Sequence, residues 1–400
     1  MAENSRITAD WLAWPATRAV VAALGEGAVR FVGGAVRDSL LGRAVSDVDL
    51  ATPLAPDEVS RRLRAAGLKA VPTGVDHGTV TAVAHHTPFE VTTLRRDVET
   101  DGRRATVAFT EDWRADAARR DFTMNALYAD PDGRVHDYVG GVADAHAGRV
   151  RFIGDPARRI GEDALRILRF FRFHAHYGAA APDAAGLAAC TALRHRLDIL
   201  SIERVQGELL RLLAAPDPRP VIASMQAAGI LAHVLPEGTA LTAFERLVAV
   251  ERALGEGDTL RRLAALTPRD ADAAARLARR LKLSNAQRKR LIAMAGPLPA
   301  PRTPQSLRAA AWREGVGAIR DRLVLAAESD DTGRLQAFLD MLAGWTPPRF
   351  PLTGDDLKAC GVGEGRELGA LLRRLKEIWV ESDFTLTRAA LLDHLAEERA

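Results

Sequence analysis

The sequence predicts an α+β fold in which a small mixed β-sheet occupies residues 1–148 and helices make up the rest. Two patterns indicate this division. Residues 79–84 alternate as a strand and are expected to pair with residues 89–94 across a turn at His85 and His86. From Pro156 onward, apolar residues recur at helical spacing and strand patterns nearly disappear.

Composition describes a folded chain with local basic clusters. Of the 400 residues, 47% are hydrophobic and 27% are charged, which suffices for about two to four domains with sizeable cores. The formal net charge is only +3, so arginine clusters, more than the whole surface, would attract an anionic partner.

The cysteines and the lengths of the apolar runs indicate the cellular compartment that the sequence favours. Cys190 and Cys360 have no Cys or His neighbours at ligand spacing, which argues against a disulfide scaffold or a zinc site and favours a reducing cytoplasm. No apolar run approaches ~18 residues, so no membrane span is expected. The N-terminus lacks a basic start before an apolar core, so no secretory signal is expected.

The first elements predict a phosphate site. A leading helix over residues 1–28 is followed by an apolar strand that turns at Gly33 and Gly34 into a short helix. Paired glycines between a strand and a helix allow backbone N–H groups to point at an anion. Arg37 could add a charge-assisted bond to the same anion.

A metal site is predicted beside this turn. Asp47 and Asp49 stand two apart in an extended run, so their side chains would share one face and could share a divalent ion. The phosphate site and the carboxylate pair together indicate metal-assisted chemistry on a nucleoside triphosphate. The alternatives are the Asp-x-Asp of a sugar-transferring enzyme or a structural hairpin.

Polar residues in the next segments extend this site. A helix is expected over 55–66, and Glu90 in the following hairpin is either a charge on an edge strand or a third carboxylate. Residues 95–111 are interpreted as a mobile loop centred on 101–104. In the block 119–127, Arg120, Asp121 and Asn125 could contact phosphate and ribose, or could form a solvated helix start.

A charged helix is predicted over residues 156–174. Arg159, Glu162, Arg166 and Arg169 form one polar stripe with Asp163 at its margin, and Arg172 lies further round. A salt-bridged surface would show the same pattern. Further helices carry basic clusters that could follow a nucleic-acid backbone or could be solvated faces, namely 261–262, 279–282 and 288–290.

These blocks, in this order, resemble the class II tRNA nucleotidyltransferase and bacterial poly(A) polymerase family, and most closely its CCA-adding members. The resemblance implies a nucleotidyltransferase palm domain at 1–148, followed by an all-α neck at 149–215, body at 216–297 and tail at 298–400. The matching segments are GGAVRDSLLGRAVSDVDLAT (33–52), FEVTTLRRD (89–97), RRDFTMNAL (119–127) and RIGEDALRILRFFRF (159–173).

The resemblance also implies residue roles. Catalysis would fall to three carboxylates, of which two bind Mg²⁺, while basic residues hold the triphosphate and an Asp–Arg pair reads the incoming base. The implied residues are Asp47, Asp49 and Glu90 for catalysis, with Asp47 and Asp49 as metal ligands; Gly33, Gly34, Arg37 and Arg120 for the triphosphate; Asp121 and Asn125 for the ribose; Asp163 and Arg166 for the base; and Arg169 and Arg172 in support.

The implied activity is addition of C, C and A to the tRNA 3′ end from CTP and ATP without a nucleic-acid template. The partners would be the acceptor end and elbow of tRNA, with no membrane and no stable protein partner. A family loop that contributes to the switch from C to A has its counterpart around 101–104, which disfavours a CC-only enzyme. The alternatives are a poly(A) polymerase, a partial CC- or A-adding enzyme, or a catalytically silent tRNA-binding factor.

Overall fold

The computed structural model describes residues 5–74, 78–100, 105–238, 241–328 and 331–399. The chain forms two compact units, Met1–Pro236 and Glu237–Ala400. The finer division into palm, neck, body and tail stays a prediction.

A seven-stranded mixed sheet is the centre of the first unit, as the sequence predicts. Its order is β3-β4-β5-β2-β1-β8-β9, and every neighbouring pair is antiparallel except β2 and β5. β3 was not predicted because it has no buried face and contains Pro72. The strands are β1 (Arg30–Val32), β2 (Leu50–Thr52), β3 (Lys69–Gly74), β4 (Thr79–Ala84), β5 (Thr87–Thr93), β8 (Leu127–Ala129) and β9 (Val135–Asp137).

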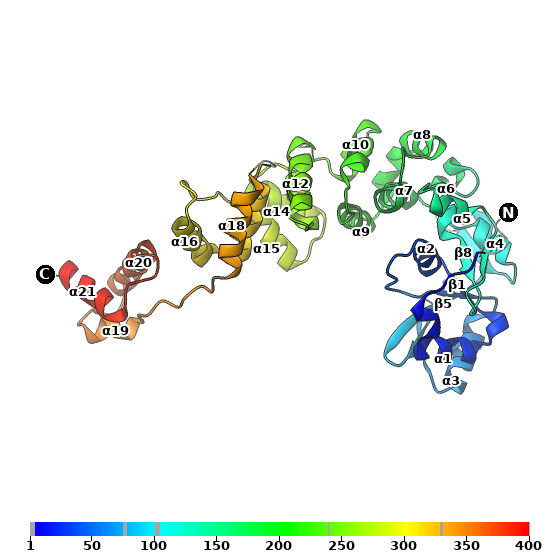
Figure 1. The fold of residues 1–400 in the computed structure, drawn as a ribbon, viewed down its shortest axis with the longest axis horizontal. Coiled ribbons are helices and arrows are strands. Elements are labelled where there is room, and N and C mark those ends of the chain that lie inside the picture. Colours follow the sequence, from blue (N-terminus) through cyan, green and yellow to red (C-terminus); the bar gives the residue numbers. More distant parts are fainter. Residues whose placement is uncertain (1–4, 75–77, 101–104, 239–240, 329–330, 400) are drawn as a thin grey trace. The chain divides into compact units, whose positions relative to one another are not determined.

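Helices α1 (Pro15–Leu24) and α3 (Pro56–Ala65) pack together against this sheet (Figure 1). The single leading helix predicted over 1–28 is wrong in extent. Pro15 occupies the first turn of α1 and Gly25, at φ 96°, ends it. The flanking segments η1 (Asp10–Ala13) and η2 (Glu26–Ala28) are 3₁₀ turns.

The loop predicted over 95–111 is in large part a hairpin. Strand β6 (Arg95–Thr100) pairs antiparallel with β7 (Ala105–Phe109) in a separate two-stranded sheet. The β-branched and aromatic residues of ATVAF suit a strand better than a loop. Residues 101–104, at the centre of the predicted loop, lie outside the described residues.

The helix predicted over 156–174 is two helices. It breaks at Asp163, whose backbone is extended at φ −152° and ψ 108°. Asp163 Oδ1 accepts the backbone N–H of Leu165 at 3.0 Å, and this local bond starts the second helix. The two helices separated by this break are α6 (Pro156–Glu162) and α7 (Leu165–Tyr177). The shorter helices that precede them in the chain are α2 (Gly34–Leu40), α4 (Trp113–Ala118), η4 (Thr123–Asn125) and α5 (Gly141–His146).

The remainder of the described chain is helical, as predicted. The first unit continues through α8 (Ala184–Ala192), η5 (Arg194–Ile199), α9 (Ile202–Leu213), α10 (Arg219–Ala227) and α11 (Leu231–Val234). The second unit contains α12 (Leu241–Ala253), α13 (Thr259–Ala265), α14 (Ala271–Arg280), α15 (Asn285–Met294), α16 (Pro304–Glu314), α17 (Val316–Leu325), α18 (Thr332–Ala343), α19 (Gly354–Ala359), α20 (Arg366–Glu381) and α21 (Arg388–Arg399).

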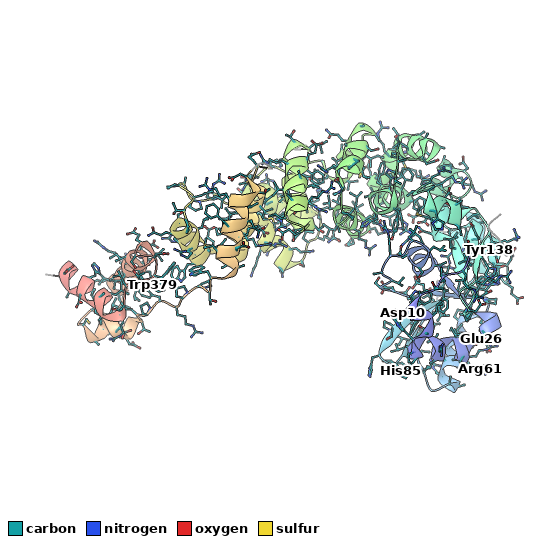
Figure 2. All side chains as sticks on the ribbon, in the orientation of Figure 1. Asp10, Glu26, Arg61, His85, Tyr138 and Trp379 are labelled. Atoms are coloured by element: carbon teal, nitrogen blue, oxygen red, sulfur yellow. The ribbon has the colours of Figure 1, made fainter. Side chains whose placement is uncertain are left out.

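One of the three basic clusters of the second unit, Arg261 and Arg262, is part of the core. Arg261 and Arg262 are buried and both pair with the buried Glu251. The possibility that these two arginines follow a nucleic-acid backbone is therefore wrong. A separate apolar cluster forms around Trp379 of α20, which is labelled in Figure 2. In the described part of the chain, no helix is long and apolar enough to span a bilayer.

Candidate active site

One pocket of about 300 Å³ in the first unit collects most of the predicted site residues. It lies where β1, β2 and β5 meet the segment after α4 and the break between α6 and α7. Seven of its lining residues were singled out from the sequence, which makes this pocket the candidate active site. The lining residues are Val32, Asp49, Glu90, Thr92, Arg95, Arg119, Arg120, Asp121, Asp163, Arg166 and Arg169.

Strand pairing brings the carboxylates together. The parallel register of β2 with β5 places Leu50 opposite Val91. Asp49 and Glu90, which precede these two residues in the chain, therefore lie next to each other. Asp49 and Asp47 precede β2, whereas the sequence had placed them within a strand. Val48 between them is buried, so the alternation expected of an extended segment is present.

The carboxylates of Asp47, Asp49 and Glu90 place like charges close together. Burial, together with repulsion from Glu90 and Asp47, raises the pKa of Asp49 to about 6, although Arg120 acts in the opposite direction. Asp47 itself is exposed and accepts a hydrogen bond from Ser46 Oγ at 2.9 Å. The described residues contain no group of three His, Cys, Asp or Glu side chains arranged to hold a metal ion.

Arg120 is held in the pocket by a buried carboxylate that the sequence reasoning missed. Asp116 Oδ2 accepts Arg120 Nη2 at 3.1 Å and the Tyr128 hydroxyl at 2.6 Å. Burial alone would raise the pKa of Asp116, but Arg120 and Arg119 lower it to about 2. The spacing of Asp116 and Arg120, four residues apart on one helical turn, was the signal that could have identified this pair.

Asp121 connects the pocket wall to α7. It is buried, and its Oδ2 accepts Arg169 Nε at 2.7 Å while its Oδ1 accepts Asn125 Nδ2 at 3.1 Å. Burial would raise the pKa of Asp121, but the guanidinium of Arg169 lowers it. Asn125 does not line the pocket and contributes through its hydrogen bond to Asp121.

Arg37 extends its guanidinium beside Gly34 of the glycine turn, and the phosphate role of this arginine stays a prediction. Its buried guanidinium donates to Asn125 Oδ1 and the Tyr177 hydroxyl, both at 2.6 Å, and to Asp38 at 2.9 Å. It does not line the pocket, so the structure presents Arg37 as a bridge between α2, η4 and α7.

The paired glycines support a tight turn at the edge of the pocket. Gly33 has φ 72°, a conformation that favours glycine, and its N–H donates to Leu127 O at 3.0 Å. That N–H is therefore committed to the sheet. A phosphate contact through Gly34 stays a prediction.

Asp163 lies at the break between α6 and α7, Arg166 lies in the first turn of α7, and both line the pocket. Arg166 Nη1 donates to Glu162 and to Arg159 O at 2.8 Å, and its Nη2 donates to Arg119 O at 3.2 Å. Residues of the predicted polar stripe thus contact one another, although they lie on two helices and not on one.

Arg172 is separated from this group. Its Nε donates to the buried Glu208 of α9, and its guanidinium lies 4.2 Å from the ring centroid of Phe173. It does not line the pocket. Thr92 and Arg95 line it without having been predicted, and Arg119, the other arginine of the block 119–127 whose two arginines were expected to offer donors for phosphate, lines it as well. Arg119 Nε donates to Arg95 O at 3.0 Å, so Arg95 and Arg119 are in contact at the pocket.

The chain is similar to proteins of known activity over most of its length. Family models described as "Poly A polymerase head domain" and "Probable RNA and SrmB- binding site of polymerase A" match residues 29–151 and 183–241. The "CCA tRNA nucleotidyltransferase 1, mitochondrial" of Mus musculus is 34% identical, over 92% of this chain and 86% of the relative. The "CCA-adding enzyme" of Levilactobacillus brevis is 33% identical, over 86% of this chain and 88% of the relative.

A solved structure shares the fold. The Bacillus stearothermophilus CCA-adding enzyme in complex with CTP has a TM-score of 0.77 and 25% identity, covering 96% of this chain and 99% of that one.

Proposed function

The chain belongs to the CCA-adding tRNA nucleotidyltransferase family, and we propose that the candidate active-site pocket on the mixed sheet adds C, C and A in turn to the tRNA 3′ end. CTP and ATP would be the nucleotide substrates and pyrophosphate the product. The observation that carries this proposal is the convergence of three chemical functions in one pocket. These are acidic groups at Asp49 and Glu90, a group of arginines, and a base-reading pair at Asp163 and Arg166.

The donor set fits Mg²⁺. Asp49, Asp47 and Glu90 repel one another, and a divalent cation would relieve that repulsion. Mg²⁺ keeps several waters and binds through one or two carboxylates plus substrate phosphates, so a closed cage of protein ligands is not required. We assign Asp47 and Asp49 as its ligands, with Glu90 beside them. When bound, the ion supplies a lowered pKa at the attacking 3′-hydroxyl and neutralises charge on the leaving pyrophosphate.

The protein groups then position the nucleotide. Arg120, fixed by Asp116 and Tyr128, directs positive charge toward the triphosphate. Asp121 offers carboxylate oxygens to the ribose, while Asn125 and Arg169 hold that carboxylate in place.

Base selection follows from donor and acceptor matching. Cytosine presents N4 amino and N3 acceptor groups, and adenine presents N6 amino and N1 acceptor groups. An Asp acceptor and an Arg donor can match either edge, so Asp163 and Arg166 would accept CTP and ATP alike. Uracil and guanine carry a carbonyl where the amino group should be, which leaves buried polar groups unsatisfied.

The helical part of the chain would bind tRNA at its acceptor end and elbow, largely through phosphate contacts and shape. We propose a cytoplasmic location, which the low cysteine content of two in 400 residues supports. The name of the murine relative is that of a mitochondrial protein, so fractionation of cells is the relevant measurement.

A tRNA extension assay tests the activity. Purified protein is incubated with tRNA lacking its 3′ CCA and with CTP, with ATP or with both, and the products are read at single-nucleotide resolution. We expect two additions with CTP alone, three with both nucleotides, and then termination. A long A-tail would identify a poly(A) polymerase, arrest after CC would identify a partial enzyme, and binding without extension would identify a silent tRNA-binding factor.

A further inference from the structure

We propose that Arg204 of α9 is a positioning residue that fixes Asp163 for selection of the incoming base, an inference that rests on the proposed function. Arg204 Nη2 donates to Asp163 Oδ2 at 2.8 Å across a separation of 41 residues. Arg204 does not line the pocket within the described residues, so it acts on the nucleotide through Asp163.

The two oxygens of Asp163 have different partners. Oδ1 accepts the Leu165 N–H at 3.0 Å, the bond that builds the break between α6 and α7. Oδ2 is thereby left as the oxygen that can meet a base. Arg204 binds that same oxygen, so the contact bears directly on the atom that reads the nucleotide.

Arg204 and a correct base can share this oxygen. A carboxylate oxygen has two lone-pair directions, so Oδ2 can accept the guanidinium and the amino group of cytosine or adenine together. Arginine has no acceptor atom, so the oxygen that it holds is presented to the pocket as an acceptor. At that position uracil and guanine carry a carbonyl oxygen, whose lone pairs would repel those of Oδ2.

Without Arg204, the hydrogen bond from the Leu165 N–H to Oδ1 would orient the carboxylate by itself. The terminal torsion of an aspartate side chain is broad, so Oδ2 could turn away from a wrong base and lower the cost of accepting it. The side chains of Arg204 and Asp163 are 47% and 36% exposed, and an exposed pair contributes little to fold stability. Loss of Arg204 should therefore affect selection more than folding.

The test compares Arg204→Ala with the wild-type chain in the tRNA extension assay, using CTP, ATP, UTP and GTP separately. We expect KM for CTP and ATP to rise and discrimination against UTP to fall by about three- to tenfold, the scale of one misplaced hydrogen bond, with kcat for CTP nearly unchanged. Arg204→Lys, which restores a cationic donor, should recover part of the discrimination. Thermal unfolding of both variants should match the wild type.

Two controls isolate the effect. Arg61→Ala removes an equally cationic side chain from the exposed Glu58 pair on α3, outside the pocket, and should leave discrimination unchanged. Because Arg204 acts through Asp163, the double variant Asp163→Ala/Arg204→Ala should discriminate no worse than Asp163→Ala alone.

The outcomes separate this inference from the proposed function. If the wild type extends tRNA selectively and Arg204→Ala is equally selective, the role of Arg204 is refuted while the function stands. A lowered KM with unchanged selection would make Arg204 a competitor of the nucleotide and would likewise overturn the inference. Failure of the wild-type chain to add C and A would overturn the proposed function itself.

Discussion

The sheet side of the pocket carries like charges that repel, whereas the helical side carries charges that are already paired. On the sheet side, burial and the neighbouring carboxylates raise the pKa of Asp49 to about 6. On the helical side, Glu162 holds Arg166 and Arg204 holds Asp163. An unbalanced acidic group is suited to recruit a cation with its substrate, while a paired group is suited to present a fixed hydrogen-bonding pattern. The two sides should therefore respond differently to substitution.

Removing an acid from the sheet side should have the largest effect. Asp49→Ala is expected to reduce nucleotide addition at least roughly a thousandfold, because it deletes the electrostatic group on which metal binding depends. Binding of tRNA, measured by filter retention, should be largely retained. Asp57→Ala, on α3 and outside the pocket, is the matched control. Full activity of Asp49→Ala would refute the metal assignment.

Substitution on the helical side should change selectivity more than chemistry. Asp163→Ala and Arg166→Ala are each expected to lower discrimination against UTP roughly ten- to a hundredfold and to slow the use of CTP and ATP. Competition between labelled CTP and UTP in single-turnover extension measures this ratio. Unchanged rejection of UTP in both variants would remove this pair from base selection and would erase the distinction between the two sides.

The buried carboxylate that holds Arg120, Asp116, should make the stability of the fold depend on pH. The pKa of Asp116 is about 2 in the folded chain, against an ordinary value of 3.8. A lowered folded-state pKa contributes stability above the unfolded value, and this contribution is lost as pH falls from about 4 toward 2. The linkage amounts to about 2 kcal/mol. Urea unfolding of wild type and Asp116→Asn should therefore converge below about pH 4. A difference that stays constant from pH 7 to 3 would contradict this account.

Local patterns predicted much of the fold. Alternation in β4 and β5 and helical spacing after Pro156 indicated a mixed sheet followed by helices, because burial of one face imposes a period on the sequence. Strand β3 was missed because neither face is buried, so it leaves no such period. The break at Asp163 was missed because a hydrogen bond between its side chain and the backbone N–H of Leu165 does not disturb the apolar spacing on either side.

The candidate site divides in the same way. The types and order of Asp47, Asp49, Glu90, Asp163 and Arg166 were readable from the chain, since each belongs to a short block with its own chemical pattern. Arg37 is an arginine beside a glycine turn, a pattern typical of phosphate contacts, and only the structure shows that Asn125 and Tyr177 from distant segments also hold its guanidinium.

The sequence by itself determined which groups are candidates for catalysis and selection, because their chemistry resides in residue type and local spacing. The tertiary structure alone decided which of them face one pocket and what holds each in place. The register of β2 with β5 sets Asp49 beside Glu90, and α9 carries Arg204 to Asp163. Such contacts depend on how separate elements pack, and no local period in the chain encodes a partner 41 residues away.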